Sequence, residues 1–158
     1  MKITVGVLFG GRSVENEISV VTASQVMESM DRDKYEIVPI YIAKSGLWYT
    51  GAALLELDAY RDMPSLLRRC TEVYFKSIYG DHNLYSNSGL FGTQKVVAKL
   101  DTILPTLHGT NCEDGTLQGV LSVVGIPYVG CNTFASANGM DKISMKQILR
   151  SSGISVVD

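Results

Sequence analysis

The sequence lacks a hydrophobic run long enough to cross a membrane. Its first apolar run, residues 3–9, ends at Gly10 and Gly11, whereas a membrane-spanning helix needs about 20 apolar residues. The cleavage-site pattern of a secretion signal is also absent, so the run predicts a buried strand. We therefore expect a cytoplasmic protein with no membrane partner.

An excess of positive charge is absent as well. The 158 residues include 14 Lys and Arg against 16 Asp and Glu, a net charge of -2. Domains that bind nucleic acid usually carry a basic surface, so we expect no nucleic-acid partner, while small acidic or zwitterionic ligands remain open. The hydrophobic fraction of 46% is ordinary for a globular protein with a core, and the length suits one domain or one domain plus the start of a second.

Cysteines are few, and their spacing is that of neither a disulfide framework nor a zinc site. The three are Cys70, Cys112 and Cys131, an odd number at scattered positions. His108 lies four residues before Cys112, but the paired C-x-x-C spacing that zinc ligands usually show is missing. We expect no disulfide and no metal bound by these residues.

Segments with the character of strands alternate with segments with the character of helices. The strands are expected at residues 3–9, 35–43, 102–107 and 126–129, and the helices at residues 13–30, 54–69, 116–124, 133–138 and after Asp141. Pro39 predicts an edge position or a bulge in the second strand. The alternation predicts an α/β fold, a Rossmann-like parallel sheet with helices on both faces.

Residues 44–99 are the least regular part. Ser45 and Gly46 predict a turn, and the residues that follow predict a hairpin. Pro64 is expected to interrupt the helix at residues 54–69. Residues 79–92, rich in Gly, Ser, Asn and Asp, predict a long loop or a loose hairpin. We interpret this part as an elaboration of the domain.

The helix at residues 116–124 has the clearest pattern. Leu117, Val120, Leu121 and Val124 recur at helical spacing and predict a single apolar face. Gly125 is expected to end the helix as a C′ glycine. This helix therefore covers one face of the predicted sheet.

The turn after the first strand carries the first candidate site. Right-handed crossovers bring the loops after the first and third strands to one rim, where such sheets bind ligands. Gly10 and Gly11 let the backbone approach a ligand, and free N–H groups at a helix start favour an anion. The Glu15 carboxylate either takes an ammonium group or merely complements the helix dipole, worth about 0.3–1 kcal/mol. The turn matches neither a P-loop nor a dinucleotide fingerprint.

The turn after the third strand carries the second candidate site, HGTNCEDGTLQG from His108 onward. Asp114 or Thr116 capping the next helix, with Gly115 in the turn, accounts for part of this pattern. His108 at the carboxyl end of a strand is left without such an explanation. It is placed to donate to a substrate carboxylate or to shuttle a proton.

A third candidate is Lys142 in the segment Met140-Asp141-Lys142. A lysine at a helix start is electrostatically unfavourable unless an anion compensates it. The residue is therefore either a phosphate ligand or an ordinary solvated surface lysine, and the local sequence alone favours the surface lysine.

Three segments follow one another along the chain: GGRSVENEIS, LHGTNCEDGTLQGVLSVVGIPYVG and ASANGMDK. Together they resemble the successive N-terminal motifs of the D-alanine–D-alanine ligases. The second motif is highly specific and MDK alone is weak. The resemblance implies a pre-ATP-grasp domain over residues 1–131 and the beginning of an ATP-grasp central domain over residues 132–158. Most of the ATP-binding domain is then expected to lie beyond this chain, which by itself is expected to have no ligase activity.

The resemblance implies a role for each matched residue. Glu15 is expected to bind the ammonium of the first D-alanine, and His108 to contact or orient its carboxylate; these two are the expected catalytic residues. Lys142 is expected to bind phosphates of ATP, and the Mg²⁺ ligands are expected downstream of residue 158. Gly10, Gly11, Ser13 and Ile18 complete the expected substrate pocket. The resemblance also implies a homodimer that serves peptidoglycan synthesis.

One position departs from the family pattern. Cys112 stands where the family usually has glycine before EDG. If the backbone there needs a positive φ, cysteine costs on the order of 1 kcal/mol, and the loop beside His108 sits differently. Nothing else in the sequence supports a reactive thiol at this position.

Three other functions stay open. Ligases that join D-alanine to D-lactate or D-serine share these motifs, so the second substrate is undecided. A non-catalytic binding or dimerisation module with the same fold is a second possibility, which Cys112 favours. A flavodoxin-like nucleotide-binding domain is a third, and the combined motifs disfavour it.

Overall fold

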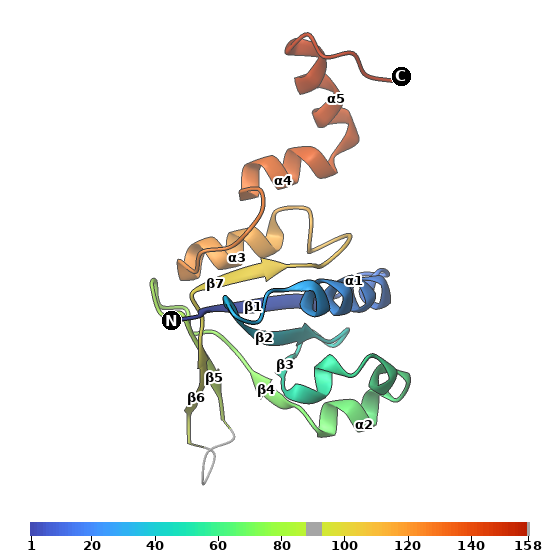
Figure 1. Cartoon of the computed structure of the whole chain (residues 1–158). Coiled ribbons are helices and arrows are strands. Elements are labelled where there is room, and N and C mark those ends of the chain that lie inside the picture. The colour runs from blue at the N-terminus through green and yellow to red at the C-terminus, as the bar shows by residue number, and fades with distance from the viewer. Residues whose placement is uncertain (88–92, 158) are drawn as a thin grey trace.

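The computed structural model describes residues 1–87 and 93–157. The strands are β1 (Ile3–Gly10), β2 (Tyr35–Ile42), β3 (Trp48–Thr50), β4 (Thr71–Val73), β5 (Asn83–Ser86), β6 (Lys95–Lys99) and β7 (Thr102–Pro105). The helices are α1 (Asn16–Ser29), α2 (Met63–Arg68), α3 (Thr116–Val124), α4 (Thr133–Met140) and α5 (Lys142–Ser151), with 3₁₀ helices η1 (Ala52–Leu55) and η2 (Leu57–Arg61). Figure 1 shows their arrangement.

A five-stranded sheet in the order β4-β3-β2-β1-β7 forms the centre of the molecule. β1 pairs in parallel with β2 on one side and with β7 on the other. β3 and β4 extend the sheet as antiparallel strands. The predicted α/β fold is thus confirmed, and its antiparallel edge comes from the hairpin predicted at Ser45 and Gly46.

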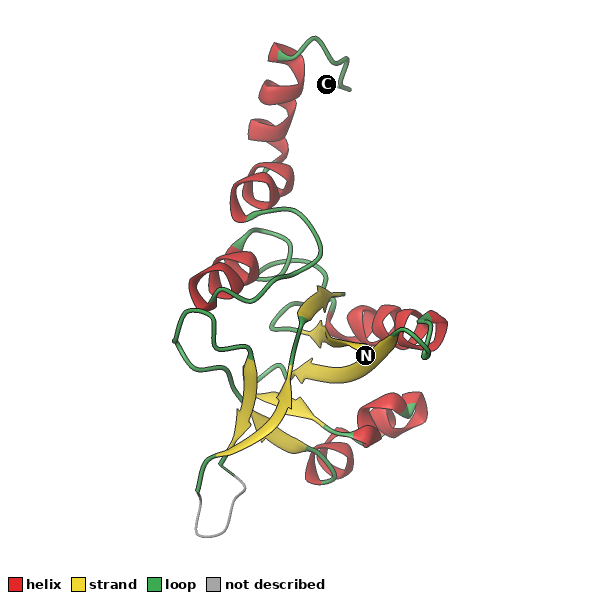
Figure 2. Cartoon of the chain, turned by 60° about the vertical axis from the view of Figure 1, so that its left-hand side comes forward, coloured by secondary structure: helices red, strands yellow, loops and turns green. Residues whose placement is uncertain are grey.

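Helices lie on both sides of this sheet (Figure 2), because successive side chains of β1 point to opposite faces. Val7 and Phe9 pack toward α1, while Leu8 packs toward α3, and all three are fully buried. The first face also buries Val20, Ala23 and Met27 of α1 and Leu66 of α2; the second buries Leu117, Leu121 and Val124 of α3. The strand predicted at residues 3–9 is therefore buried on both faces from Val5 onward, whereas Ile3 is exposed.

The prolines act differently from their sequence-based interpretation. β2 is an interior strand, but β3 pairs only with Ile40–Ile42, so Pro39 lies just outside the antiparallel ladder. Its missing N–H therefore costs no hydrogen bond to β3. Pro64 does not interrupt a long helix: it lies in the first turn of α2, where no N–H is needed. The strand expected at residues 102–107 ends at Pro105.

The remaining boundaries differ in small ways. The helix expected from residue 13 begins at Asn16. Val120 was expected on the buried face of α3 but is 47% exposed. Residues 126–129 form only one parallel bridge, between Ile103 and Tyr128. The loop or hairpin expected at residues 79–92 includes β5, paired with β6, while residues 88–92 lie outside the described residues.

α4 and α5 lead away from the sheet (Figure 1), and α5 packs against α4. The Asp141 carboxylate accepts a hydrogen bond of 2.8 Å from the Ser144 amide, so Asp141 caps α5 as predicted. Gly153 follows the helix with a φ of +76°. Across the part of the chain that the structure describes, no helix combines the length and the apolar character that crossing a membrane requires.

Candidate functional site

The glycine turn after β1 is closely packed against its surroundings. Gly10 and Gly11 have φ angles of +88° and +98°, which side-chain-bearing residues rarely adopt. The Gly10 N–H donates to Ser19 Oγ at 2.8 Å, and the Gly11 N–H donates to the Ile42 carbonyl at 2.8 Å. Tertiary contacts therefore use both of these N–H groups, so neither is available to a ligand.

Ser19 joins the three segments that form the rim. Its fully buried hydroxyl accepts from the Gly10 N–H and donates to the Thr106 carbonyl at 2.9 Å, just after β7. α1 is thereby fixed to the ends of two parallel strands. The same contact sets where the side chains of the first turns of α1 lie relative to the His108 loop.

We expect Ser19→Ala to lower the free energy of unfolding by about 2–3 kcal/mol, because it leaves a buried N–H and a buried carbonyl without this partner. Urea unfolding followed by circular dichroism measures the loss. The matched control is Ser29→Ala, which changes an exposed serine of the same helix and is expected to stay within about 0.5 kcal/mol of the wild type. Equal effects of the two substitutions contradict this role for Ser19.

The first and second candidate segments meet at this rim. Ser13 Oγ donates to the His108 carbonyl at 2.7 Å, a contact between residues 95 positions apart, and accepts from the Glu15 N–H at 3.1 Å. The Glu15 carboxylate lies so close to Gly109 that a Cβ there would overlap Glu15 Oε2. Glu15 and the His108 loop therefore share one side of the molecule, as the sequence predicted.

The imidazole of His108 lies between α1 and the loop that follows β7. Its Nε2 is 2.9 Å from Thr22 Oγ1, which itself donates to the Ile18 carbonyl. In the tautomer with its proton on Nε2, the ring donates to this hydroxyl. The other ring nitrogen, Nδ1, faces Glu113 Oε1 at 3.8 Å, and Glu113 Oε2 accepts from the Gly109 N–H at 2.8 Å. Thr22 therefore orients the ring, and Glu113 lies beyond hydrogen-bonding distance on its other side.

Carboxylates dominate the charge of this rim. Glu15 and Glu113 are exposed, and Asp114 lies in the same loop. Burial opposes ionisation of Asp114, but hydrogen bonds from Asn111 and Thr116 N–H groups outweigh it and lower its pKa. Asp114 thus fixes the loop and the first residue of α3, although the N-cap residue is Gly115 and not Asp114 or Thr116 as predicted. The exposed Glu15 carboxylate suits a small cationic group.

The structure does not bring every predicted residue to this rim. Ile18 lies on α1 within one turn of Glu15 and is 60% exposed. Lys142 is exposed at the first position of α5, a helix that leads away from the sheet (Figure 1). Among residues 1–87 and 93–157, no three His, Cys, Asp or Glu side chains form a group that could hold a metal ion.

Comparison with known proteins identifies the family of this chain. The sequence profile of the family described as "D-ala D-ala ligase N-terminus" matches residues 4–131. The chain belongs to the D-alanine–D-alanine ligase family. A D-alanine–D-alanine ligase of Thermosipho melanesiensis is 43% identical over 156 residues, 99% of this chain and 42% of that protein. The chain thus spans less than half the length of this relative.

Solved ligase structures share the fold. The D-alanine–D-alanine ligase of Coxiella burnetii matches with a TM-score of 0.83 and 33% identity, over 99% of this chain and 43% of that one. The VanG D-Ala:D-Ser ligase of Enterococcus faecalis matches with a TM-score of 0.82 and 33% identity, over 100% of this chain and 44% of that one. Both matches therefore include the sheet, the rim and the helices that follow in this chain.

Cys112, which departs from the ligase pattern, is accommodated without strain. Among the described residues other than glycine, a positive φ is found at Asn111, the neighbour of Cys112, where it is 64°. Asparagine tolerates this conformation. Cys112 is 4% exposed, and its sulfur lies against Gly11. The condition for a backbone cost at Cys112, a positive φ, is therefore not met, and the loop has the contact between Glu15 and Gly109.

Cys112 is expected to resist alkylation. Burial, followed by the charges of Asp114, Glu113 and Glu15, raises the pKa of its thiol to about 11. That value leaves about 100-fold less thiolate at pH 8 than an ordinary thiol provides. Iodoacetamide followed by peptide mass spectrometry should modify exposed Cys131 long before Cys112. Equal rates in the folded protein contradict the burial of Cys112, and urea should abolish the difference.

Sequence reasoning missed the residues that orient the site. Ser19 and Thr22 follow Glu15 by four and seven positions, so the three share one face of α1. That helical spacing was a usable signal. Glu113 lies in the quoted second motif, but its contact with Gly109 depends on how the loop folds back. Asn16, whose side chain donates to the Gly11 carbonyl at 2.7 Å, gave no signal in the sequence.

Proposed function

We propose that this chain is the part of an ATP-dependent D-alanine–D-alanine ligase that binds the first D-alanine, in the synthesis of peptidoglycan precursors. One observation carries the proposal: the Glu15 carboxylate lies against Gly109, directly beside His108, in a family of D-alanine ligases. A carboxylate beside an imidazole complements the two charges of a small zwitterion.

In the proposed reaction Glu15 accepts hydrogen bonds from the ammonium of D-alanine. His108, oriented by Thr22, directs the substrate carboxylate or moves a proton near it. A carboxylate is a poor electrophile. ATP would transfer its phosphoryl group to this carboxylate, which gives an acyl phosphate and ADP. The amine of a second substrate would then attack the acyl phosphate, and phosphate would leave. Binding and positioning of the first substrate are the contributions that we assign to these residues.

Lys142 is an exposed cation on α5. We propose it as a phosphate ligand, and we propose that Mg²⁺ and the rest of ATP bind to downstream parts of the ligase. A coupled assay of ADP release with D-alanine should then show no turnover for the 158 residues alone. Turnover above background contradicts this division of roles.

An NMR titration with D-alanine tests the proposed substrate site. We expect shifts at the Glu15 side-chain carboxyl, the Gly109 amide and the His108 ring, because these groups lie at the rim. L-Alanine is the control, and its methyl group points differently once the ammonium and carboxylate are placed. Shifts confined to other surfaces, or no shifts at saturating ligand, contradict the assignment and favour a non-catalytic module.

The second amino acid is the point on which the relatives differ. The VanG relative is named a D-Ala:D-Ser ligase, and its fold matches this chain as well as that of the Coxiella burnetii enzyme. We propose D-alanine because the more identical relatives carry that name. D-Serine or D-lactate is the alternative, and product analysis by the complete ligase with each acceptor distinguishes them.

We further propose that the complete ligase is a cytoplasmic homodimer. The support is the family resemblance and the absence, within the described residues, of a helix that could span a membrane. Light scattering coupled to size-exclusion chromatography measures the mass in solution. A monomer mass at all concentrations tested contradicts the dimer.

A further inference from the structure

A cavity of about 590 Å³ lies on the other side of α1 from His108, and neither Glu15 nor His108 lines it. Its walls come from α1, the end of β2, η2 and α2. The apolar part of the wall consists of Val20, Val21, Leu57, Met63 and Leu67. A space of this size suits a small molecule with one ring or a branched chain.

Two tyrosines line the inner part of the cavity. Tyr41 and Tyr60 pack against each other with ring centroids 5.9 Å apart, and Phe9 lies behind both. The Tyr60 hydroxyl donates to the Leu54 carbonyl at 2.9 Å, and the Tyr41 hydroxyl donates to Asn16 Oδ1 at 3.0 Å. Because both phenol protons are already used, the inner part favours an apolar ligand body.

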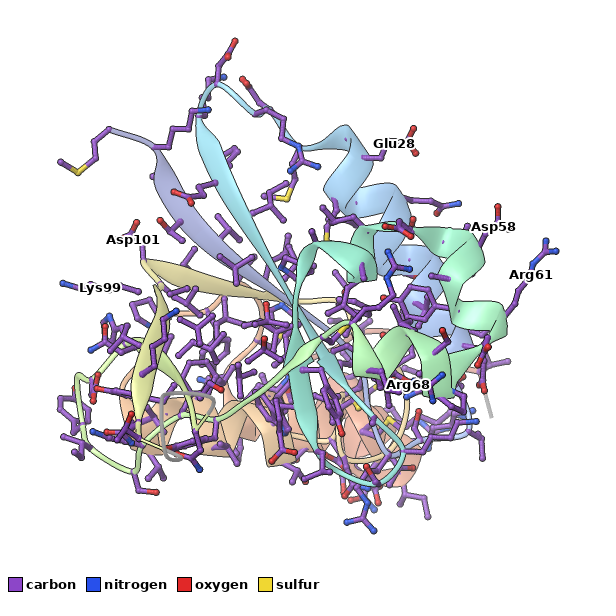
Figure 3. All side chains as sticks on the ribbon, turned by 90° about the horizontal axis from the view of Figure 1, so that it is seen from below. Glu28, Asp58, Arg61, Arg68, Lys99 and Asp101 are labelled. Carbon is purple, nitrogen blue, oxygen red and sulfur yellow. The ribbon has the colours of Figure 1, made fainter. Side chains whose placement is uncertain are left out.

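The mouth of the cavity carries more positive than negative charge. Lys44 and Arg61 line it together with Glu17, which pairs with Lys44 at 2.6 Å. Arg61 pairs with Asp58 at 3.2 Å, but the two side chains are 86% and 91% exposed (Figure 3). Such an exposed pair contributes little, so Arg61 can exchange it for an anion at the mouth. The complementary ligand carries a single negative charge.

Asn16 connects the cavity to the glycine turn. Its side chain lines the cavity, accepts from the Tyr41 hydroxyl and donates to the Gly11 carbonyl at 2.7 Å. Asn16 is 3% exposed and directly follows Glu15 in the chain. A ligand that displaces the Tyr41 ring would therefore act on a side chain that is hydrogen-bonded to the turn before Glu15.

We propose that this cavity is a second binding site, for small aromatic or branched aliphatic monocarboxylates, and that Tyr41 and Asn16 transmit its occupancy to the turn of Gly11 and Glu15. The apolar walls take the ligand body, and Arg61 with Lys44 takes the carboxylate. This site does not depend on the proposed binding of D-alanine.

The test uses 4-phenylbutyrate as the probe and the uncharged 4-phenyl-1-butanol as its control. Each compound is titrated into the 158-residue chain, and NMR follows the chemical shifts of the protein. We expect 4-phenylbutyrate to bind with a Kd of about 1 mM, as expected for 12 heavy atoms. The methyl signals of Val20 and Leu67 should shift, together with the amides of Gly11 and Glu15. The alcohol should bind about three- to tenfold more weakly, because it lacks the charge-assisted contact.

Variants locate the binding. Val21→Trp fills the cavity from α1 and should weaken binding at least about tenfold. Leu57→Trp fills it from η2 and serves the same purpose if Val21→Trp does not fold. Val14→Trp is the matched control, because Val14 is 96% exposed on the segment before α1 and does not line the cavity. Arg61→Gln should weaken 4-phenylbutyrate about three- to tenfold and leave the alcohol unchanged.

Each result decides the proposal. Unchanged affinity in a folded Trp-filled variant overturns the cavity as the site. Equal affinity of acid and alcohol for the wild type overturns the role of the cations. Shifts at Val20 and Leu67 without shifts at Gly11 and Glu15 overturn the transmission through Asn16.

Discussion

Gly10→Ala is expected to lower the free energy of unfolding by about 2–5 kcal/mol. A Cβ at Gly10 would overlap the Ile42 carbonyl and come within 2.6 Å of the Tyr41 ring. The φ of +88° adds about 1–2 kcal/mol of backbone strain, and the overlap adds about 1–3 kcal/mol. The carbonyl belongs to an interior strand, so it cannot move aside without disturbing the pairing of β1 with β2. Urea unfolding measures the loss.

Gly11→Ala provides the comparison. A Cβ at Gly11 would meet the side chains of Cys112 and Leu107, at 2.7 and 3.1 Å, and side chains can be shortened. We therefore expect Cys112→Ala to recover about 1 kcal/mol in the Gly11→Ala background, measured as a double-mutant cycle. Gly10→Ala should show no such recovery with Cys112→Ala. Recovery in both backgrounds, or in neither, contradicts these contacts.

Glu15→Gln is expected to weaken D-alanine binding by about tenfold or more. Glutamine keeps the shape of the side chain but removes the negative charge, and hydrogen bonds between charged partners are worth about 1.5–3 kcal/mol. The exposure of Glu15 favours the lower end of that range. An NMR titration that follows the Gly109 amide measures the change in Kd.

Glu17→Gln is the matched control for this experiment. It makes the same chemical change two residues away, where Glu17 pairs with Lys44 on the cavity side of α1. Its D-alanine affinity should stay within about twofold of the wild type, since surface charges at a distance are screened. If Glu15→Gln and Glu17→Gln weaken binding equally, the effect is the net charge of α1, and a specific ammonium contact at Glu15 is excluded.

Local sequence patterns predicted several elements closely. Residues 3–9 form a buried strand because β-branched and aromatic side chains alternate onto two apolar faces. α3 spans Thr116–Val124 and is followed by Gly125 at a φ of +77°. The cap at Asp141 was also visible, because an N-cap side chain contacts an amide only three residues away.

Patterns that depend on distant partners were harder to interpret. Pro39 indicated an edge, although β2 is interior, because the length of β3 decides where the ladder stops. Val120 fits the apolar spacing of α3 but lies beyond the width of the buried face. No local pattern shows what the N–H groups of Gly10 and Gly11 contact, because their acceptors, Ser19 and Ile42, are brought near only by folding.

The sequence by itself determined the strands β1, β2 and β7 with the helices α1 and α3, the family, and the convergence of the Glu15 and His108 loops, because parallel strands put their carboxyl ends at one edge. The tertiary structure alone decided which groups remain available there. Ser19 and Ile42 accept from the N–H groups of Gly10 and Gly11, and Thr22 occupies Nε2 of the imidazole, while Glu15 stays exposed. The physical reason is that a hydrogen bond depends on two groups meeting in space, and a local pattern names only one of them.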